Sequence, residues 1–457
     1  MLKILCPSRC MNERAWILKV MLTEFLGLDY TVENSDSESM RIEAQGRTLE
    51  MPDAFFIQAE HAWLKEGSLP GQPLKVWDMS DSGLDINCVD PMIPVIFGDG
   101  SVDLARDRAR LGLDIFGSAF FMLSRYEEAV KTERDRFGRF PAEASLVCQE
   151  GFLDRPIVNE YLEILWSVMK HLWPDVVCVQ RRPQTRVSCD VDVPYAPGTK
   201  SVLKLLRQMG GDIVRRKDPM QAVRSIRNYV RAKKGDYTLD PFLNALDRMM
   251  DVNEAAGNRM AFYMIADHSD ADRDGCYSIH EPVIRALIRR IAGRGHEIGL
   301  HASFHTDQDS IQFCKEADIL RTVLKEEGVE QETLGARQHF LRWQTPITAR
   351  SAEQAGMAYD ATLGFADHAG FRCGVCYEYP FYDVVDRREM VLRERPLIVM
   401  DQSVFAYMKC SFGQDGRAVF ERLKKRCRQF NGDFTVLWHN YQFLDKRAMK
   451  LYREVIQ

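Results

Sequence analysis

The sequence lacks any long apolar run. Its longest candidate, LDIFGSAFFMLS, is far shorter than the roughly 18 apolar residues that a membrane-spanning helix needs. The first residues, MLKILCPSRCMNERAW, place charges where a signal peptide would need its apolar stretch. From the sequence alone we therefore expect a cytoplasmic protein without a transmembrane helix.

An excess of positive charge, a regular cysteine pattern and two common catalytic motifs are also missing. The formal net charge of −5 and the pI near 6.1 argue against a nucleic-acid partner. The 12 cysteines have no regular spacing, which favours free thiols over a disulfide framework. Neither a glycine-rich phosphate loop nor a Gly-x-Ser-x-Gly elbow occurs, so neither motif indicates the chemistry.

The length of 457 residues exceeds one ordinary core and predicts two domains. We place a smaller α/β domain at residues 1–180 and a second domain at residues 181–457, with RRPQT at 181–185 as the boundary. Within the first, LDIFGSAFFMLSRYEEAVK at 113–131 carries apolar residues at helical spacing and predicts a helix.

From residue 186, short apolar segments alternate with helical patterns. The predicted strands are RVSCDVDV (186–193), MAFYMIAD (260–267), HEIGLH (296–301), TLGARQHF (333–340), PLIVMD (396–401) and FTVLWH (434–439). This alternation predicts an α/β fold with βαβ units and a parallel sheet or barrel.

Reactive side chains stand at the ends of four of these strands: Asp190, Asp192, His301, Arg337 and His439. Because active sites of parallel α/β barrels lie at the carboxyl ends of their strands, this placement predicts an active site there.

Two histidines four residues apart predict a metal site at the same edge. His301 and His305 can face one point if the chain turns helically after its strand. One aspartate of Asp190-Val191-Asp192 can complete a set of three ligands, which is the usual number at a catalytic zinc site.

Residues 200–234 are strongly basic, with eleven Lys and Arg against two Asp. Two interpretations stay open for this segment. It is a solvated helical insertion, or it is a basic face for an anionic glycan, a sugar phosphate, a lipid-linked substrate or a membrane surface.

Four motifs, SCDVDVP, HEIGLHASFH, GARQHF and LWHN, resemble those of the polysaccharide deacetylases, the NodB-homology group also known as carbohydrate esterase family 4. The resemblance covers about residues 185–445. The segments DIFGSAFFMLSRYEE and GFADHAGFRCGVCYEYPFYD resemble a bacterial subgroup with an extra N-terminal domain, found with surface-polysaccharide genes. The resemblance to this family and subgroup implies an irregular (β/α) barrel preceded by a smaller α/β domain.

The resemblance also implies roles at the metal site. Asp190 would be the general base, and Asp192 would ligate a divalent metal, most typically Zn²⁺, together with His301 and His305. The commonest family motif has adjacent aspartates, whereas Val191 separates them here.

The remaining implied roles concern proton transfer and orientation. Arg337 would orient the base, His439 would be the general acid, and Asp360 in AYDATLGF would tune that histidine. His339, His268 and Trp343, none of which the resemblance assigns, either line the pocket or are structural.

The implied activity is metal-dependent removal of N-acetyl or O-acetyl groups from an amino sugar of a surface polysaccharide or its precursor. Two alternatives stay open. A glycosyltransferase would use Asp190 and Asp192 as a DxD motif, but this leaves His301 and His305 unexplained. The second alternative is a deacetylase-like barrel that has lost its activity and only binds glycans.

Overall fold

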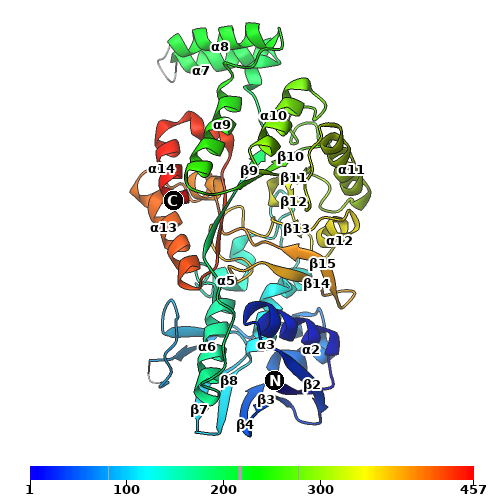
Figure 1. The fold of residues 1–457 in the computed structure, drawn as a ribbon, viewed down its shortest axis with the longest axis vertical. Coiled ribbons are helices and arrows are strands. Elements are labelled where there is room, and N and C mark those ends of the chain that lie inside the picture. The colour runs from blue at the N-terminus through cyan, green and yellow to red at the C-terminus, as the bar shows by residue number, and fades with distance from the viewer. Residues whose placement is uncertain (81, 215–218, 276) are drawn as a thin grey trace.

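The computed structural model describes residues 1–80, 82–214, 219–275 and 277–457 (Figure 1). The molecule is elongated, with a small sheet near the N-terminus at one end, a large sheet in the middle and a pair of helices at the other end. Among the described residues, no helix combines the length and the apolar character needed to span a membrane.

The small sheet has six strands in the order β2-β1-β3-β4-β8-β7. They are β1 (Leu2–Pro7), β2 (Tyr30–Ser35), β3 (Ser39–Ala44), β4 (Arg47–Pro52), β7 (Gly98–Leu104) and β8 (Arg108–Leu113). A separate pair consists of β5 (Lys75–Asp78) and β6 (Met92–Val95).

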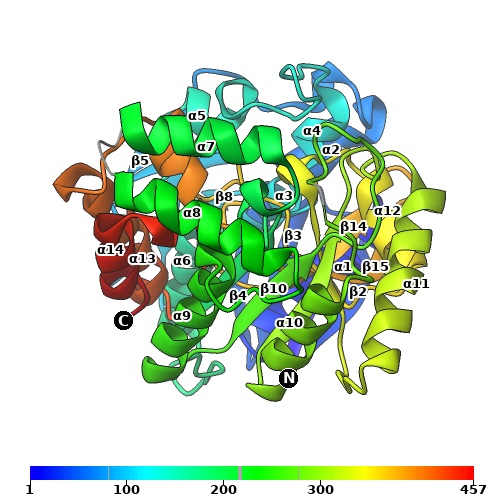
Figure 2. The same ribbon diagram turned by 90° about the horizontal axis from the view of Figure 1, so that it is seen from above.

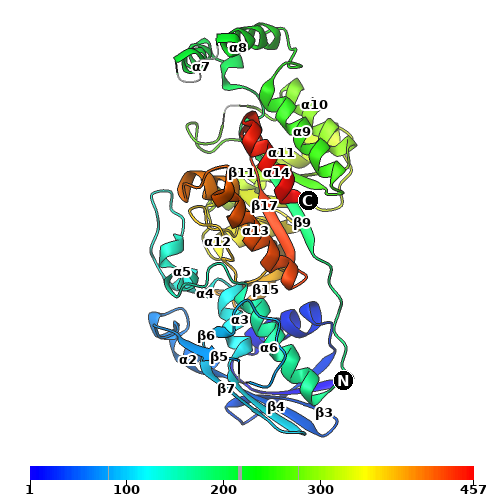
Figure 3. The same cartoon turned by 90° about the vertical axis from the view of Figure 1, so that its left-hand side faces the viewer.

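Helices of this part lie between the small sheet and the large one (Figure 3). They include α1 (Met11–Leu18), α3 (Ile115–Leu123) and α6 (Ile157–Leu172), and the others are α2 (Ala54–Ala62), α4 (Tyr126–Val130) and α5 (Leu146–Gln149). The helix predicted at 113–131 is two helices, because Arg125 adopts a left-handed conformation (φ 53°) between α3 and α4.

The large sheet has nine strands in the order β14-β15-β13-β12-β11-β10-β9-β17-β16. They are β9 (Gln184–Val191), β10 (Met260–Met264), β11 (Glu297–Ala302), β12 (Gly335–Gln338), β13 (Tyr359–Asp360), β14 (Tyr379–Asp383), β15 (Arg388–Glu394), β16 (Val399–Met400) and β17 (Asp433–Leu437). All pairs are parallel except β14 with β15.

Helices surround this sheet when it is seen from above (Figure 2). They are α9 (Pro241–Ala255), α10 (Pro282–Gly293), α11 (Ser310–Glu326), α12 (Ile347–Gln354), α13 (Gln414–Gln429) and α14 (Lys446–Ile456). In α10, for example, Ile284, Leu287, Ile288 and Ile291 form one buried stripe at helical spacing. The predicted α/β class is confirmed, and the sheet forms part of a curled barrel. The division into domains at residue 180 stays a prediction.

The six predicted strands correspond to β9, β10, β11, β12, β16 and β17. Strand β10 reads MAFYM and is buried along its whole length, as expected of a parallel strand with both faces covered. Because β9 pairs with both β10 and β17, the residues at its carboxyl end lie between those that follow β10 and β17.

The basic segment 200–234 forms α7 (Val202–Val214) and α8 (Pro219–Ala232), a helical hairpin. It projects beyond α9 and α10 at one end of the molecule (Figures 1 and 3). Residues 215–218 of this segment lie outside the described residues. Short 3₁₀ and π turns complete the fold: η1 (Lys19–Phe25), η2 (Glu66–Ser68), η3 (Ala142–Ala144), η4 (Pro197–Thr199), η5 (His339–Leu341), η6 (Ser403–Tyr407) and η7 (Asn440–Leu444).

Candidate metal centre and active site

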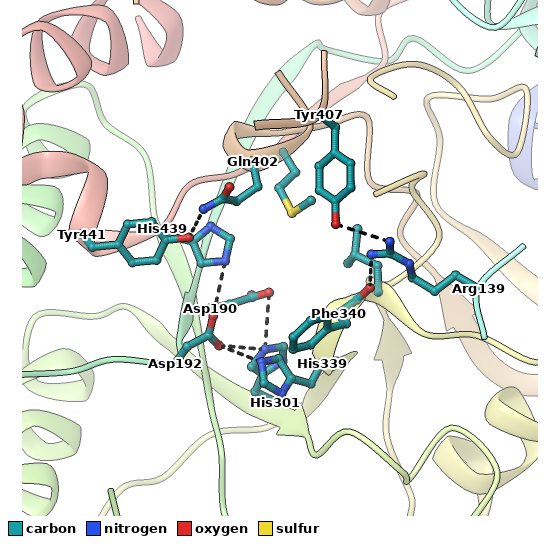
Figure 4. Close-up of a pocket in the computed structure, with 12 residues that line it drawn as sticks. Arg139, Asp190, Asp192, His301, His339, Phe340, Gln402, Tyr407, His439 and Tyr441 are labelled. Atoms are coloured by element: carbon teal, nitrogen blue, oxygen red, sulfur yellow. Dashed lines mark hydrogen bonds and ion pairs between the residues drawn. The ribbon is translucent and has the colours of Figure 1, made fainter. Parts of the chain in front are cut away.

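A cavity of about 260 Å³ opens at the carboxyl edge of the large sheet (Figure 4). Acidic and imidazole side chains gather on one side of it, and Arg139, Tyr407 and Phe340 lie on the other. Its lining comprises Arg139, Asp190, Asp192, His301, His339, Phe340, Leu341, Met400, Gln402, Tyr407, His439 and Tyr441.

Asp190, at the end of β9, is buried and held by an arginine. Nη1 of Arg337 donates to Asp190 Oδ1 at 3.0 Å and to the hydroxyl oxygen of Ser188 at 2.7 Å. Nε of Arg337 donates to the carbonyl of Ala361 at 2.9 Å. These bonds fix the direction of the Asp190 carboxylate, because a planar guanidinium presents its donors in a fixed geometry.

Arg337 itself rests on an aromatic ring inside the sheet. Its guanidinium lies 4.6 Å from the centre of the Tyr263 ring. That ring fits because Gly299 on the neighbouring strand β11 has no side chain, and a Cβ there would come within 2.5 Å of the ring. The glycine in the HEIGLH motif therefore makes room for the support of Arg337.

Asp192, two residues further, is the point on which three imidazoles converge. His301 Nε2 lies 3.1 Å from Asp192 Oδ1, and His339 Nε2 lies 3.7 Å from the same oxygen. His439 Nε2 lies 3.5 Å from Asp192 Oδ2. The three histidines come from β11, from the residue after β12 and from the segment after β17.

The opposite nitrogen of each imidazole is bound to an outer acceptor. Nδ1 of His301 donates to the carbonyl of Arg337 at 2.9 Å, and Nδ1 of His339 donates to Asp274 at 2.9 Å. Nδ1 of His439 donates to Asp401 at 2.7 Å. Because these acceptors cannot donate, Nδ1 of each ring carries a proton, and Nε2 faces Asp192 with a lone pair in a neutral ring or with a second N–H in a protonated one.

This arrangement fits a bound cation. Lone pairs of Nε2 and carboxylate oxygens face each other, so a proton or a cation is needed between them. Asp192 Oδ1 is buried and accepts no hydrogen bond. Asp192, His301 and His339 offer ligand atoms that all lie within 4.8 Å of one another. Two imidazoles and one carboxylate are a ligand set of catalytic zinc sites, and the outer bonds are those that usually orient such ligands.

Electrostatics at the site follow from burial and from these neighbours. Burial opposes the charge on Asp192, but the surrounding imidazoles prevail and lower its pKa. Burial likewise opposes protonation of His301, and Asp190 and Asp192 raise its pKa. For His439, burial lowers the pKa, but Asp401 outweighs burial and raises it to about 9.

The structure brings together five of the seven residues singled out from the sequence, namely Asp190, Asp192, His301, Arg337 and His439. It does not bring His305 to them. The His305 side chain is 53% exposed, and its Nε2 lies 3.4 Å from Asp270. Its backbone N–H donates to Ser269, which fixes a turn that directs the ring away from Asp192. His339 lies beside Asp192 and His301 instead.

Asp360 does not contact His439. Its carboxylate accepts hydrogen bonds from the backbone N–H and hydroxyl of Thr362, and burial raises its pKa to about 6. Asp401 contacts His439 instead, because its strand β16 pairs directly with β17, whereas four strands separate β13 from β17.

Three further residues at the pocket were not singled out from the sequence. Asp401 ends the predicted strand PLIVMD, so the strand-end argument that selected Asp190 applied to it as well. The ring of Tyr441 stacks on His439, with ring centres 5.1 Å apart. Arg139 comes from residues 1–180, and no sequence signal connects it with the site.

Arg139 supports the turn that follows β12. Its Nη1 donates to the carbonyl of Phe340 at 3.1 Å, and its Nη2 donates to the Tyr407 hydroxyl at 3.4 Å. Phe340 adopts a left-handed conformation (φ 61°), which costs about 1 to 3 kcal/mol in a residue with a bulky side chain. This turn also carries His339, so Arg139 stabilises the backbone next to a candidate metal ligand.

Comparison with known proteins matches residues 2–174 to a family described as a family of unknown function, DUF7033. A comparison with curated protein sequences finds no match.

Several solved structures resemble this chain at low identity. A provisionally assigned polysaccharide deacetylase from Mycobacterium smegmatis is 18% identical, with a TM-score of 0.40, over 62% of this chain and 84% of that one. PuuE allantoinase is 13% identical, with a TM-score of 0.35, over 60% and 83%. A provisionally assigned polysaccharide deacetylase of O-antigen biosynthesis from Bordetella bronchiseptica is 15% identical, with a TM-score of 0.27, over 46% and 76%. We base the proposed function on the geometry of the site.

Proposed function

We propose that the protein is a metal-dependent hydrolase that removes an N-acetyl or O-acetyl group from an amino sugar of a surface polysaccharide or its precursor. One observation carries this proposal. Asp192, His301 and His339 offer ligand atoms within 4.8 Å of one another, with Asp190 held by Arg337 and His439 held by Asp401 beside them. The sugar substrate is proposed from the resemblance of the strand-end motifs to polysaccharide deacetylases.

Asp192, His301 and His339 would hold the divalent cation, for which Zn²⁺ suits the nitrogen and oxygen donors. When bound, such a cation activates a water molecule at neutral pH and polarises the acetyl carbonyl. In this proposal His339 replaces the His305 of our sequence-based assignment, because Nε2 of His339 faces Asp192 whereas Nε2 of His305 faces Asp270.

In this proposal, Asp190 accepts a proton from the attacking water. Its Oδ2 lies 3.6 Å from His301 Nε2, so the carboxylate borders the cation site. Its Oδ1 is engaged by Arg337, which holds the other oxygen toward the cavity. A positioned base of this kind contributes typically about 10² to 10⁴-fold to a hydrolysis rate.

His439 would donate a proton to the departing amine or hydroxyl. It lines the same cavity, and Asp401 accepts hydrogen bonds from both its Nδ1 and its backbone N–H. Asp401 therefore fixes the ring and its tautomer, as the carboxylate does in a hydrolase triad.

The cavity walls suit a sugar ring. Tyr407, Tyr441 and Phe340 contribute aromatic faces, and Gln402 contributes a polar amide. Apolar walls with few polar groups are typical of small-molecule sites. A DxD glycosyltransferase is disfavoured, because Arg337 already engages Asp190 and the imidazoles surround Asp192.

The test is acetyl release from a panel of acetylated amino sugars, glycans and lipid-linked precursors, followed by mass spectrometry. The metal-loaded protein should remove acetyl groups from at least one class, and the Asp190→Asn variant should not. If glycans bind equally to both proteins and no acetyl group is ever released, the protein is a binding module and the proposal fails.

A further inference from the structure

The helical hairpin of α7 and α8 exposes an unusual amount of apolar surface. Seven large apolar side chains on these two helices are between 41% and 72% exposed: Val202, Leu203, Leu206, Met220, Val223, Ile226 and Val230. They are a third of the 21 exposed large apolar side chains among the described residues. Two helices of a folded protein rarely carry so large a share without a partner.

These residues are arranged as stripes. On α8, Met220, Val223, Ile226 and Val230 recur at helical spacing, so they lie along one side of the helix. The buried residues of α8, which include Ala222 and Asn228, lie on the other side. One side of α8 is therefore buried in the hairpin, and the other side carries a stripe of exposed apolar residues.

Basic residues flank the apolar stripes. Lys204 and Arg207 on α7, and Arg224 and Arg227 on α8, are exposed. The eleven Lys and Arg and two Asp of residues 200–234 give this segment a net charge of +9, in a chain whose formal net charge is −5. The rest of the chain is therefore acidic, and the helices α7 and α8 of this basic segment form one end of the molecule (Figure 1).

The base of the hairpin is fixed to the edge that carries the active site. The buried Asp240 accepts hydrogen bonds from the Ala196 backbone at 3.0 Å and from Asn228 at 2.9 Å, and it also caps α9. Lys200 forms an ion pair of 2.8 Å with Glu281 at the start of α10. The hairpin follows β9, the strand that positions Asp190 and Asp192.

We propose that the α7–α8 hairpin docks the protein on an anionic lipid surface. Apolar side chains flanked by Lys and Arg are the features that hold a helix in the interface of an anionic bilayer. A second copy of the chain is a poorer partner, because two hairpins of charge +9 would repel each other. This inference does not depend on the proposed enzymatic activity.

Docking would also set the position of the active site. Because Asp240 and Lys200 tie the hairpin to the catalytic edge, the cavity would be held close to the lipid surface. Substrates attached to that surface would then reach the cavity without diffusing through solution.

The experiment measures flotation of the full-length protein with two kinds of vesicle. One is phosphatidylcholine alone, and the other is phosphatidylcholine mixed with phosphatidylglycerol. The protein should bind the anionic vesicles, and high salt should weaken binding. The Arg224→Glu/Arg227→Glu variant should bind at least about 30-fold more weakly, because each basic residue contributes about fivefold. The Val223→Ser/Ile226→Ser variant should also bind more weakly, with unchanged salt dependence.

Matched controls lie elsewhere on the surface. Arg106→Glu/Arg110→Glu reverses two exposed charges in the small sheet at the opposite end of the molecule. Val391→Ser removes an apolar side chain that is 85% exposed. Both should bind vesicles like the unmodified protein. Circular dichroism and thermal unfolding of every variant check that it is folded.

Three outcomes would overturn the proposal. One is absence of binding to anionic vesicles at low salt, and another is equal binding by the hairpin variants and their controls. The third is sedimentation as a dimer that Val223→Ser/Ile226→Ser dissociates, without vesicle binding, which would assign the stripe to self-association. None of these measurements depends on catalytic turnover. Failure of the lipid-docking proposal can therefore be distinguished from failure of the proposed enzymatic activity.

Discussion

His439 and Asp401 are joined by two hydrogen bonds to the same carboxylate. Nδ1 of His439 donates to Oδ1 of Asp401 at 2.7 Å, and the backbone N–H of His439 donates to Oδ2 at 2.9 Å. The ring therefore cannot rotate without losing a buried bond, and its Nε2 stays directed into the cavity.

Asp401→Asn should accordingly reduce turnover without unfolding the protein. We expect kcat to fall by about 10 to 100-fold, the usual loss when a residue that orients a functional histidine is removed. KM should change little. Asp360→Asn is the matched comparison, because Asp360 is equally buried but bonds only to Thr362. A larger loss of kcat in Asp360→Asn than in Asp401→Asn would restore the sequence-based assignment of Asp360.

The second prediction concerns the identity of the metal ligands. His301→Ala and His339→Ala should each lower zinc affinity more than about 100-fold, since loss of a ligand costs more than loss of an outer partner. His305→Ala should keep its metal, because the exposed ring lies beside Asp270. Elemental analysis and competition with a chelator measure these contents. Metal loss in His305→Ala alone would show that the ring turns inward on binding.

A third prediction separates chemistry from metal binding. Asp190→Asn should lower turnover by about 10² to 10⁴-fold yet keep the metal, because Asp192 and the imidazoles remain. Asp192→Asn should lose the metal. Metal content and kcat are measured on the same samples, and the reverse pattern would exchange the roles of the two aspartates.

The fourth prediction concerns acid stability. Glu128 is buried, yet Arg372 and Arg125 outweigh burial and lower its pKa from 4.5 to about 2. Its stabilising contribution is therefore complete above about pH 4.5 and is lost as the pH falls toward about 2. Glu128→Gln should lower the free energy of unfolding by about 3 to 5 kcal/mol at pH 7, as for other broken buried pairs.

The difference between Glu128→Gln and the unmodified protein should shrink in acid. Urea unfolding at pH 7 and at successively lower pH measures it. Glu133→Gln changes an exposed glutamate nearby and should have little effect at any pH. A loss of stability that did not depend on pH would rule out the charge as its cause.

Six of the nine strands of the large sheet, and the edge that carries the candidate site, were predictable from the sequence; β13, β14 and β15 were not predicted. Short apolar segments such as MAFYM can only be buried strands in this alternating pattern, and parallel strands place their carboxyl ends together. That rule selected Asp190, His301, Arg337 and His439 without knowledge of the order of the strands.

The order of the strands in the sheet could not be predicted from the sequence. Asp360 and Asp401 both end short strands, and only the pairing of β16 with β17 brings Asp401 to His439. His305 was selected from its spacing to His301, but hydrogen bonds to Ser269 and Asp274 shape the turn after β11. Those partners come from a different loop, so local spacing did not predict the direction of the ring.

Arg139 changes the view of what the first 180 residues do. It is the residue through which that part of the chain enters the cavity, where it holds the carbonyl of Phe340 beside His339. A chain reduced to residues 181–457 would keep Asp190 and His439 but would lose Arg139 from the pocket wall, and with it the hydrogen bond to the turn that carries His339. Residues 1–180 thus contribute, through Arg139, to the wall of the cavity.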